Sequence, residues 1–335
     1  MTITVLYPEA MYPDLSVERR IFGPEVRVIM RASETLSDLA DADCADANGL
    51  MIFRQLASAA DLARFPRLKA LVRMGVGYDR VDRKEAAARG ILVCNVPDYG
   101  TNEVADHALA MALALRRGLL LHHEKQRAEP PAPWAWFEHP LVRRNSAQTF
   151  GILGLGRIGT AAGLRAKAFG FHVLAYDPYQ PNGLELALGI ARVRALEELL
   201  RASDILSIHT PLTAETRGML GPAELALLPP GAVVVNTARG PILDHDALMD
   251  LMQEGRIAGA GLDVLPEEPP VEPIPRLLAA YRARAPWLEG RLIVTPHSAF
   301  YTPDAWMDIR VKSAETMRAA LLGPRRQNVI PPEGD

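Results

Sequence analysis

The stretch LGLGRIG, residues 153–159, decides the fold that we expect. It follows the apolar run TFGIL and opens the helical pattern RIGTAAGLRAKAF. In a dinucleotide-binding turn, Gly154 permits the tight turn, Gly156 lets the backbone approach a pyrophosphate, and Gly159 lets the helix pack on the strand. The start of the helix adds unpaired N–H groups and a partial positive charge. The stretch therefore predicts a nucleotide site.

An acidic residue stands at the matching distance. Asp177 closes the strand pattern HVLAYD, 23 residues after Gly154, where a ribose 2′-hydroxyl requires an acceptor. Its carboxylate would repel the 2′-phosphate of NADP, and no arginine follows it in YDPYQ. We therefore expect NAD as the cofactor.

Strand and helix patterns alternate on both sides of this turn, which is typical of parallel α/β sheets. Upstream, helices are expected in SAADLARFP, in VDRKEAAARG and in DLSVERRIFG, which Asp14 would cap and Gly23 would close. The expected upstream strands are ITVLY, VRVIM, GLMIF, ALVRM and ILVCNV. The expected downstream strands are TFGIL, HVLAYD, DILSIHT, AVVVNT, AGAGLDV and LIVTPH. The downstream set predicts a doubly wound sheet, and PDAWMDIRVKSAETMRAALLG predicts a final amphipathic helix.

A helix and an extended arm are expected between the two alternations. Residues 101–124 are rich in Ala and Leu and contain no proline, which predicts one unbroken helix. Three prolines at 130, 131 and 133 then exclude a helix. Trp134 and Trp136 lie on this arm, and large aromatic residues on a linker are typical of interfaces.

Bulk properties limit the class of protein. The 335 residues, 49% hydrophobic and 23% charged, predict a soluble chain of two domains. A net charge of −3 argues against nucleic acid as a partner. No apolar run is long enough for a membrane span and no signal peptide is recognisable, so we expect a cytoplasmic protein. Cys44 and Cys94 form neither a disulfide framework nor a metal-ligand spacing, and no metal is expected.

Three candidate catalytic residues follow strands of the downstream set. Arg239 follows VVVNTA, Glu268 follows GLDVLPE, and His297 follows LIVTP. Ligands of such sheets bind outside the carboxyl ends of the strands. Taken singly, such residues are more often a loop-capping arginine, a solvated acidic turn and a structural histidine. Together they supply the cation, carboxylate and imidazole that hydride transfer to a keto acid requires.

The chain resembles the D-2-hydroxyacid dehydrogenases over nearly its whole length. The resemblance rests on RMGVGYDRVD, GLGRIG, NTARGPILD, GAGLDVLPEEPP and TPHSAFY, which occur in the order of the family. The stretch LRAKAFGFHVLAYDPY is most similar to the branch of the C-terminal binding proteins, which are NAD-dependent corepressors with a dehydrogenase fold. The resemblance implies a Rossmann NAD domain at 101–298. This domain would be inserted into a smaller, flavodoxin-like α/β substrate-binding domain at 1–100 and 299–335.

The resemblance also implies a mechanism. Hydride would move between nicotinamide C4 and C2 of a 2-oxo acid, in a cleft that closes around the substrate. Arg239 would bind the carboxylate and carbonyl end of the substrate. His297 would exchange a proton with the C2 oxygen, and Glu268 would pair with His297 and favour the imidazolium.

Further site residues are implied by the same resemblance. Asp263 would hold the nicotinamide carboxamide, and other cofactor contacts are expected from Arg157, Ile158, Thr210, Thr237 and Ala238. Substrate contacts are expected from the backbone of Val76 and Gly77, from Arg73 and Arg54, and from Phe300. The alternative for the two arginines is a surface ion pair. Phe300 replaces a tryptophan of the corepressor branch, and segment 269–290, longer than in that branch, either shapes the cleft mouth or decorates the surface.

We expect a homodimer in which the arm packs on the other subunit, with at least one of its tryptophans near the cleft of that subunit. The alternative is that Trp134 and Trp136 cover the core of their own domain. The competing function is an NAD-sensing adaptor with little or no turnover. Glyoxylate, hydroxypyruvate, pyruvate and bulkier oxo acids present the same carboxylate and carbonyl, so the sequence does not name the substrate.

Overall fold

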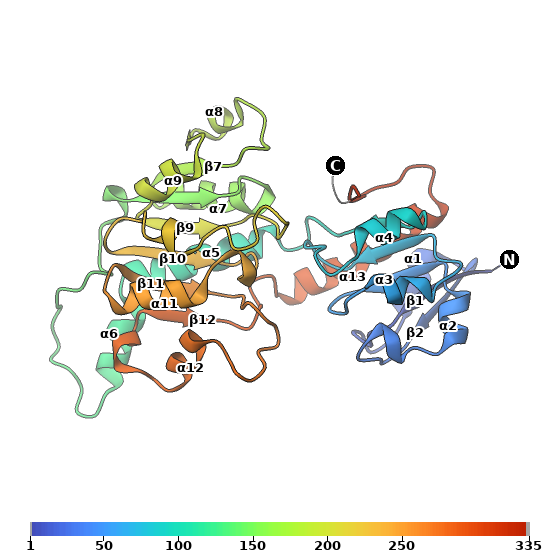
Figure 1. Ribbon diagram of the computed structural model, residues 1–335, viewed down its shortest axis with the longest axis horizontal. Helices are drawn as coiled ribbons and strands as arrows, with labels where there is room; N and C mark the ends of the chain where they lie inside the picture. The colour runs from blue at the N-terminus through green and yellow to red at the C-terminus, as the bar shows by residue number, and fades with distance from the viewer. Residues whose placement is uncertain (1, 333–335) are drawn as a thin grey trace. The chain divides into compact units, whose positions relative to one another are not determined.

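The computed structural model describes residues 2–332, which form two compact units, each built on one parallel sheet (Figure 1). One unit contains residues 2–100 and 301–332, and the other contains 101–300. The predicted parallel α/β class is confirmed. No helix within 2–332 combines the length and the apolar character that a bilayer crossing requires.

The first unit holds a five-stranded sheet in the order β2-β1-β3-β4-β5, the order of flavodoxin-like sheets. Its strands are β1 (Ile3–Tyr7), β2 (Val26–Met30), β3 (Gly49–Ile52), β4 (Ala70–Arg73) and β5 (Leu92–Cys94). Its helices are α1 (Ser16–Phe22), the 3₁₀ turn η1 (Leu36–Asp38), α2 (Asp41–Asp46), α3 (Ala59–Ala63), α4 (Arg83–Ala88) and α13 (Pro303–Leu322). The expected strands and helices are present. Sequence reasoning missed α2 because its six residues, DADCAD, carry no apolar repeat.

Helix α13 returns to this unit from the far end of the chain and packs against α1, β3 and β4. A buried ion pair anchors it. The guanidinium of Arg310 donates to both carboxylate oxygens of the fully buried Glu18, at 2.8 and 2.7 Å, and to Asp14 at 3.1 Å. Asp14 also accepts the N–H of Ser16 at 2.8 Å, although Leu15 is the residue that precedes α1. Asp14, the expected cap of α1, therefore lies one residue before the N-cap position.

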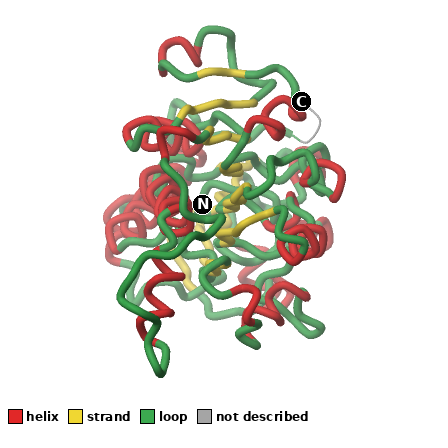
Figure 2. The backbone as a smooth tube through the Cα atoms, turned by 90° about the vertical axis from the view of Figure 1, so that its left-hand side faces the viewer, coloured by secondary structure: helices red, strands yellow, loops and turns green. Residues whose placement is uncertain are grey.

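The second unit holds a seven-stranded sheet in the order β12-β11-β10-β9-β6-β7-β8. Its strands are β6 (Thr149–Leu153), β7 (His172–Tyr176), β8 (Ala191–Arg192), β9 (Ile205–Ile208), β10 (Ala232–Asn236), β11 (Ile257–Leu262) and β12 (Leu292–Val294). The strand order reverses direction between β6 and β9, which is the switch point at which doubly wound sheets bind ligands. Figure 2 shows helices on both sides of these strands.

Two apolar layers cover the faces of this sheet. One face packs against α5 and α7, and the other against α9, α10, α11 and α12. The helices are α5 (Thr101–Arg116), α6 (Leu119–Arg127), α7 (Arg157–Ala168), α8 (Leu184–Leu188), α9 (Leu196–Ala202), α10 (Pro222–Leu225), α11 (His245–Gln253) and α12 (Arg276–Arg282). Short 3₁₀ turns are η2 (Asn145–Ala147), η3 (Gly240–Ile242) and η4 (Pro286–Leu288).

The expected single helix over residues 101–124 is wrong. Helix α5 ends at Arg116, Gly118 has a left-handed backbone with φ 59° and ψ 30°, and α6 starts at Leu119. Glycine adopts this conformation at little cost and ends many helices. The approach of Val142 is a second reason for glycine at this position, because a Cβ on Gly118 would lie 3.0 Å from Cγ2 of Val142.

Two further segments bear on earlier expectations. The arm, residues 128–144, contains neither helix nor strand, and Trp134 and Trp136 are 93% and 83% exposed. The alternative in which these tryptophans cover their own core is therefore wrong. Segment 269–290 carries α12 and η4, and it buries Leu277 and Leu288 in the core, so surface decoration does not describe it.

Candidate active site

The glycine turn has the geometry that a pyrophosphate site requires. Gly154 has a φ of +93°, and a Cβ there would lie 2.9 Å from the backbone nitrogen of Thr210. A Cβ on Gly159 would lie 1.9 Å from the carbonyl oxygen of Gly154, so the helix packs closely on the turn. At Gly156 a Cβ would meet nothing within 4 Å. The backbone at the start of α7 is thus open to a ligand, while its neighbours are tightly packed.

Asp177 lies directly after β7 and is tied to the same turn. Its Oδ2 accepts the N–H of Leu155 at 2.8 Å, and its Oδ1 accepts the N–H of Tyr179 at 2.9 Å. A carboxylate has further acceptor positions, so these bonds leave capacity for a ribose hydroxyl. The structure therefore gives Asp177 a positioning role that the sequence did not reveal, and its contact with the cofactor stays a prediction.

Two buried hydroxyl groups fit an absent ligand. Thr210 follows β9 and Thr237 follows β10, and among residues 2–332 no group pairs with the hydroxyl of either side chain. Buried polar groups in proteins are almost always hydrogen-bonded, so unpaired ones need an explanation. Both follow strands at the same edge of the sheet as the glycine turn. A dinucleotide, rich in hydroxyl and phosphate oxygens, suits these residues.

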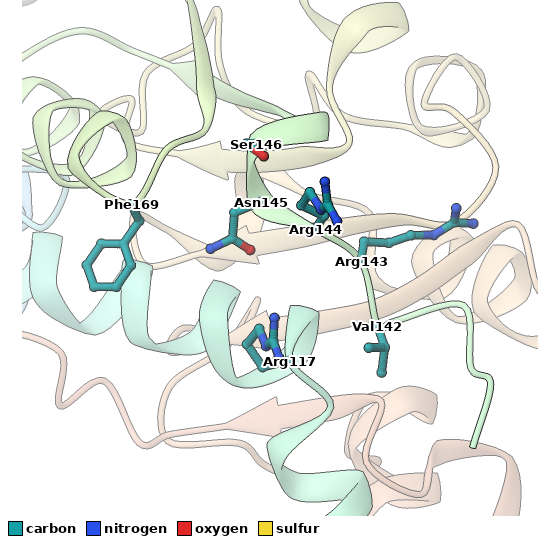
Figure 3. A pocket seen from close by; sticks show the side chains of 7 residues that line it. All are labelled: Arg117, Val142, Arg143, Arg144, Asn145, Ser146 and Phe169. Atoms are coloured by element: carbon teal, nitrogen blue, oxygen red, sulfur yellow. The ribbon is translucent and has the colours of Figure 1, made fainter. Parts of the chain in front are cut away.

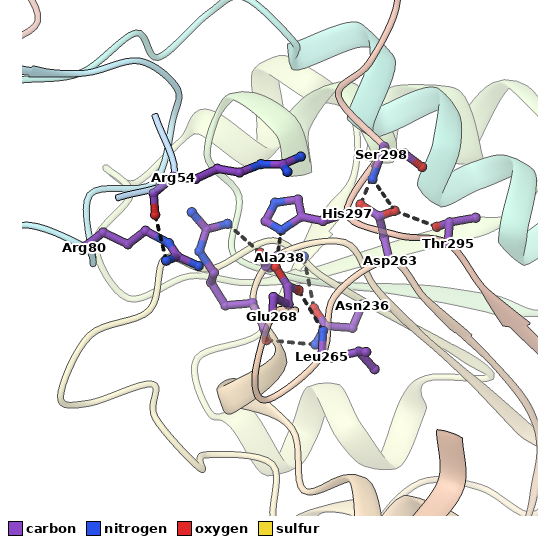
Figure 4. Close-up of polar contacts among 12 residues, drawn as sticks. Arg54, Arg80, Asn236, Ala238, Asp263, Leu265, Glu268, Thr295, His297 and Ser298 are labelled. Carbon is purple, nitrogen blue, oxygen red and sulfur yellow. Dashed lines mark hydrogen bonds and ion pairs between the residues drawn. The ribbon is translucent and has the colours of Figure 1, made fainter. Parts of the chain in front are cut away.

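His297 and Glu268 form a close pair (Figure 4). Nδ1 of His297 lies 2.5 Å from Oε2 of Glu268, and the other oxygen of Glu268 accepts the N–H of Leu265 at 2.8 Å. Burial tends to raise the pKa of Glu268, but His297, Leu265 and Arg239 together lower it below its usual value. Glu268 is therefore ionised near neutral pH, and its contact is with Nδ1, not Nε2, of His297.

Asp263 organises the turn that carries His297. It is buried, and its carboxylate accepts the hydroxyl of Thr295 at 2.5 Å and the N–H groups of Ser298 and Ala299 at 2.9 and 3.0 Å. Its backbone carbonyl accepts the N–H of His297 at 2.7 Å. These bonds hold His297 at a φ of +51°, a left-handed conformation that few side chains adopt. Whether Asp263 also binds the nicotinamide stays a prediction.

Arg239 is held by its neighbours in a similar way. The Asn236 side chain accepts the N–H of Ala238 at 3.0 Å and donates to the carbonyl of Arg239 at 2.9 Å. Gly240 permits a close approach to the next loop, since a Cβ there would lie 2.0 Å from the carbonyl of Leu265. Arg239 thus lies near the loop of Glu268 and adds to the lowering of its pKa.

Sequence reasoning missed these supporting residues. Asn236 and Gly240 lie in the quoted NTARGPILD region, but nothing local marks their contacts. His107, on α5, lies 3.1 Å from the hydroxyl of Thr295, although 188 residues separate them in the chain. Only the tertiary fold brings such pairs together.

The predicted site residues fall into two groups. The expected cofactor and catalytic residues belong to the second unit, together with Phe300, whose ring centroid lies 6.4 Å from that of His297. The remaining substrate candidates, Arg54, Arg73, Val76 and Gly77, belong to the first unit.

In the first unit, Arg73 is only 9% exposed and its guanidinium lies over the Phe53 ring at 5.7 Å, so a surface ion pair does not describe it. Gly75 lets that guanidinium lie against the following loop, since a Cβ there would be 1.7 Å from Nη1 of Arg73. Arg54 is exposed, and its carbonyl accepts a hydrogen bond from Arg80 at 2.9 Å (Figure 4).

Within residues 2–332, no group of three or more His, Cys, Asp or Glu side chains is arranged to hold a metal ion. Cys44 and Cys94 are both buried as free thiols.

The chain is similar to known proteins in both sequence and fold. Residues 109–299 match the family model of the D-isomer specific 2-hydroxyacid dehydrogenase, NAD binding domain. A glyoxylate reductase of Korarchaeum cryptofilum is 36% identical over 271 residues, which cover 79% of this chain and 76% of that protein. A D-3-phosphoglycerate dehydrogenase of Mycobacterium leprae is 37% identical over 78% of this chain and 47% of its own length. The crystal structure of a D-lactate dehydrogenase from Aquifex aeolicus, complexed with NAD and lactic acid, superposes with a TM-score of 0.80 at 28% identity, covering 94% of each chain.

Proposed function

Since the chain belongs to the D-isomer specific 2-hydroxyacid dehydrogenase family, we propose that it reduces a 2-oxo acid to the D-2-hydroxy acid, and catalyses the reverse reaction, with NAD as its cofactor. It is an oxidoreductase that uses a nicotinamide cofactor. The observation that carries the proposal is the pairing of His297 with an ionised Glu268, in the unit that contains the glycine turn.

The proposed cofactor site uses the residues that follow the strands. Gly156, Arg157 and Ile158 would bind the pyrophosphate through the start of α7, and Asp177 would accept from the adenosine ribose. Further contacts would come from Thr210, Thr237, Ala238 and Asp263, of which the two threonines have unpaired buried hydroxyls. When bound, the nicotinamide supplies the hydride that reaches C2 of the substrate.

The proposed proton transfer uses Nε2 of His297. That atom would donate a proton to the C2 oxygen as the alcohol forms, or accept one in the reverse direction. Glu268 holds the ring through Nδ1 and would stabilise the imidazolium. Arg239 would bind the substrate carboxylate, which suits a planar guanidinium.

Residues of the first unit would complete the substrate site. We propose that the N–H groups of Val76 and Gly77 bind the substrate carboxylate, with Arg73 and Arg54 as further cationic contacts. The support is local: Arg73 lies against the loop that contains Val76, and the side chain of Asn95 donates to the Val76 carbonyl at 2.7 Å. Phe300, adjacent to His297, would limit the size of the substrate side chain.

A panel of 2-oxo acids tests the enzyme proposal. Glyoxylate, pyruvate, hydroxypyruvate and a bulky aromatic oxo acid are each incubated with NADH and then with NADPH, and oxidation is followed at 340 nm. Turnover of at least one acid, faster with NADH, is expected. Tight NADH binding without turnover of any acid would instead favour the NAD-sensing adaptor, the function of the corepressor branch that LRAKAFGFHVLAYDPY resembles.

We further propose that the chain forms a two-fold homodimer in which the arm packs on the other subunit, with at least one of Trp134 and Trp136 near the cleft of that subunit. The support is the exposure of Trp134 and Trp136 on a segment without helix or strand, since such residues are favoured in interfaces. Sedimentation at micromolar concentration should give a dimer. Replacing both tryptophans with alanine should weaken that dimer, and a parent protein that sediments as a monomer would overturn the proposal.

A further inference from the structure

A basic pocket lies at the opposite edge of the seven-stranded sheet from the candidate active site. It has a volume of about 440 Å³, within the range of small-molecule sites. Arg117 follows α5, Phe169 follows α7, and the rest of the lining precedes β6 (Figure 3). We call it the arginine pocket, and its principal lining residues are Arg117, Arg143, Arg144, Asn145, Ser146 and Phe169.

The charge of this pocket is uncompensated. Arg117, Arg143 and Arg144 are exposed, none of them forms an ion pair with any residue in 2–332, and no acidic side chain lines the pocket. The whole chain has a net charge of −3, so this local excess of positive charge is not a property of the surface in general. Three arginines around one pocket favour an anion with several oxygens.

A fourth arginine is joined to this segment through its backbone, since the carbonyl of Arg116 accepts the N–H of Arg143 at 3.2 Å. Arg116 is 1% exposed, and its guanidinium donates to the carbonyls of Gly231, at 2.9 Å, and Asp204. Burial lowers the pKa of Arg116 to about 10, the charge of Asp204 opposes that shift, and the charge of Arg143 adds to it. The positive charge of Arg143 therefore acts on the buried guanidinium of Arg116, where little water screens the interaction.

The remaining lining residues narrow the class of ligand. The Oδ1 atom of Asn145 is buried and has no partner among residues 2–332, so a hydroxyl donor on the ligand would satisfy it. Ser146 supplies a further hydroxyl, and Phe169, 54% exposed, supplies an apolar wall. Phosphate oxygens match the arginines, and a carbon skeleton with hydroxyl groups matches the rest.

We propose that the arginine pocket binds a small phosphorylated metabolite that carries free hydroxyl groups, at a site separate from the catalytic residues. This ligand would contact Arg143 and Arg144 at the end of the arm, Arg117 at the end of α5, and Asn145 in η2. Its binding is independent of the proposed dehydrogenase activity, because the catalytic residues follow the opposite ends of the strands.

The test uses fructose 1,6-bisphosphate as the probe and isothermal titration calorimetry as the measurement. The full-length protein is first saturated with NADH, so that the nucleotide site is filled. One saturable site per chain is expected, and binding should weaken at least tenfold in the Arg143→Ala/Arg144→Ala variant. Arg20→Ala, which removes an arginine charge from an exposed position on α1 in the other unit, should bind like the parent.

Three outcomes would overturn the proposal. They are the absence of saturable binding, equal weakening in Arg20→Ala and in the double variant, and equal affinity for citrate, which carries carboxylates in place of phosphates. A hydrogen-exchange measurement places the ligand independently of any variant. Exchange should slow over residues 142–147 and stay unchanged over the glycine turn at 153–159, and the reverse pattern would also overturn the proposal.

Discussion

At the residue scale, the left-handed backbone of His297 guides the choice of variant. Asparagine tolerates a φ of +51° and also keeps a polar side chain, so His297→Asn should retain the local turn. Loss of the general acid should lower kcat for 2-oxo acid reduction by about 10² to 10⁴. NADH affinity, measured by fluorescence titration, should change little. Activity within a few-fold of the parent would exclude the proposed role.

Glu268→Gln tests the electrostatic part of the pair. Glutamine keeps an oxygen for the N–H of Leu265, at 2.8 Å in the parent, but removes the negative charge. In the proposed role, a carboxylate 2.5 Å from Nδ1 stabilises a positive charge on the ring while His297 acts as the acid, and glutamine would not. The alkaline limb of the kcat/KM profile should therefore move to lower pH in the reductive direction. A profile that stays in place would argue that Glu268 only positions the ring.

Asp177→Asn tests the choice of cofactor. Alanine would remove the acceptors of both the Leu155 and the Tyr179 N–H groups, whereas asparagine keeps one oxygen for one of them and loses the charge that repels a 2′-phosphate. The ratio of kcat/KM for NADH to that for NADPH should fall by about tenfold, the equivalent of about 1.4 kcal/mol. Circular dichroism of both proteins serves as the control for folding. An unchanged ratio would show that Asp177 does not select the cofactor.

At the element scale, the break between α5 and α6 depends on Gly118. Gly118→Ala should lower the free energy of unfolding by about 1 to 2 kcal/mol, because alanine is strained at a φ of +59° and its Cβ would press on Val142. Gly170→Ala is the matched control: φ there is +83°, but a Cβ meets nothing within 4 Å. Urea unfolding should show the larger loss for Gly118→Ala, and equal losses would mean that contact with Val142 adds nothing.

This break also shows what the sequence reveals and what it does not. Period, composition and flanking glycines predicted every strand of the two sheets except β8, because those signals are local. The two residues of β8, Ala191 and Arg192, are too few to carry such a signal. In the sequence, Gly118 looked like an ordinary position in a helix rich in Ala and Leu. One cause of the glycine requirement there is the approach of Val142, a residue 24 positions away in the chain. The helices α8 and α12 are short and lie in segments without a clear repeat, so composition alone did not separate them from loops.

The same division holds for the candidate site. Position at a strand end and a family resemblance pointed to Arg239, Glu268 and His297, and the structure pairs the last two. The groups that hold them, such as Asn236 and Thr295, act through hydrogen bonds set by the folded backbone. Such positioning is invisible in a single sequence because it depends on distance in space.

At the scale of the whole molecule, the half-buried His209 and the buried His245 contribute to the response to acid. Burial lowers the pKa of both His209 and His245 to about 4, while the unfolded chain titrates near 6.5. Below pH 6.5 the unfolded state binds more protons, so stability is lost as the pH falls from about 6.5 towards 4. Each histidine should reduce the free energy of unfolding by about 2 kcal/mol between pH 7 and pH 5.

Urea unfolding at these two pH values checks this expectation. In the His245→Asn variant the difference between pH 7 and pH 5 should be about 2 kcal/mol smaller than in the parent. The contributions of His209 and of His139, whose pKa burial also lowers, remain in that variant. A parent protein with equal stability at the two pH values would contradict the protonation argument.

The position of helix α13 in the chain determines the order in which the two units can fold during translation. The helix packs on β3 and β4, yet about 200 residues, 101–300, are translated between β5 and α13. At ~5–20 residues per second, the ribosome needs on the order of 10 to 40 s to make that stretch. During this interval the nascent five-stranded sheet has no α13 to cover it, whereas residues 101–300 are continuous and can fold as soon as they emerge. The first unit is therefore the first to be started and the last to be completed. The face of its sheet that α13 covers stays exposed during synthesis, and we expect a chaperone at the ribosome exit to bind it.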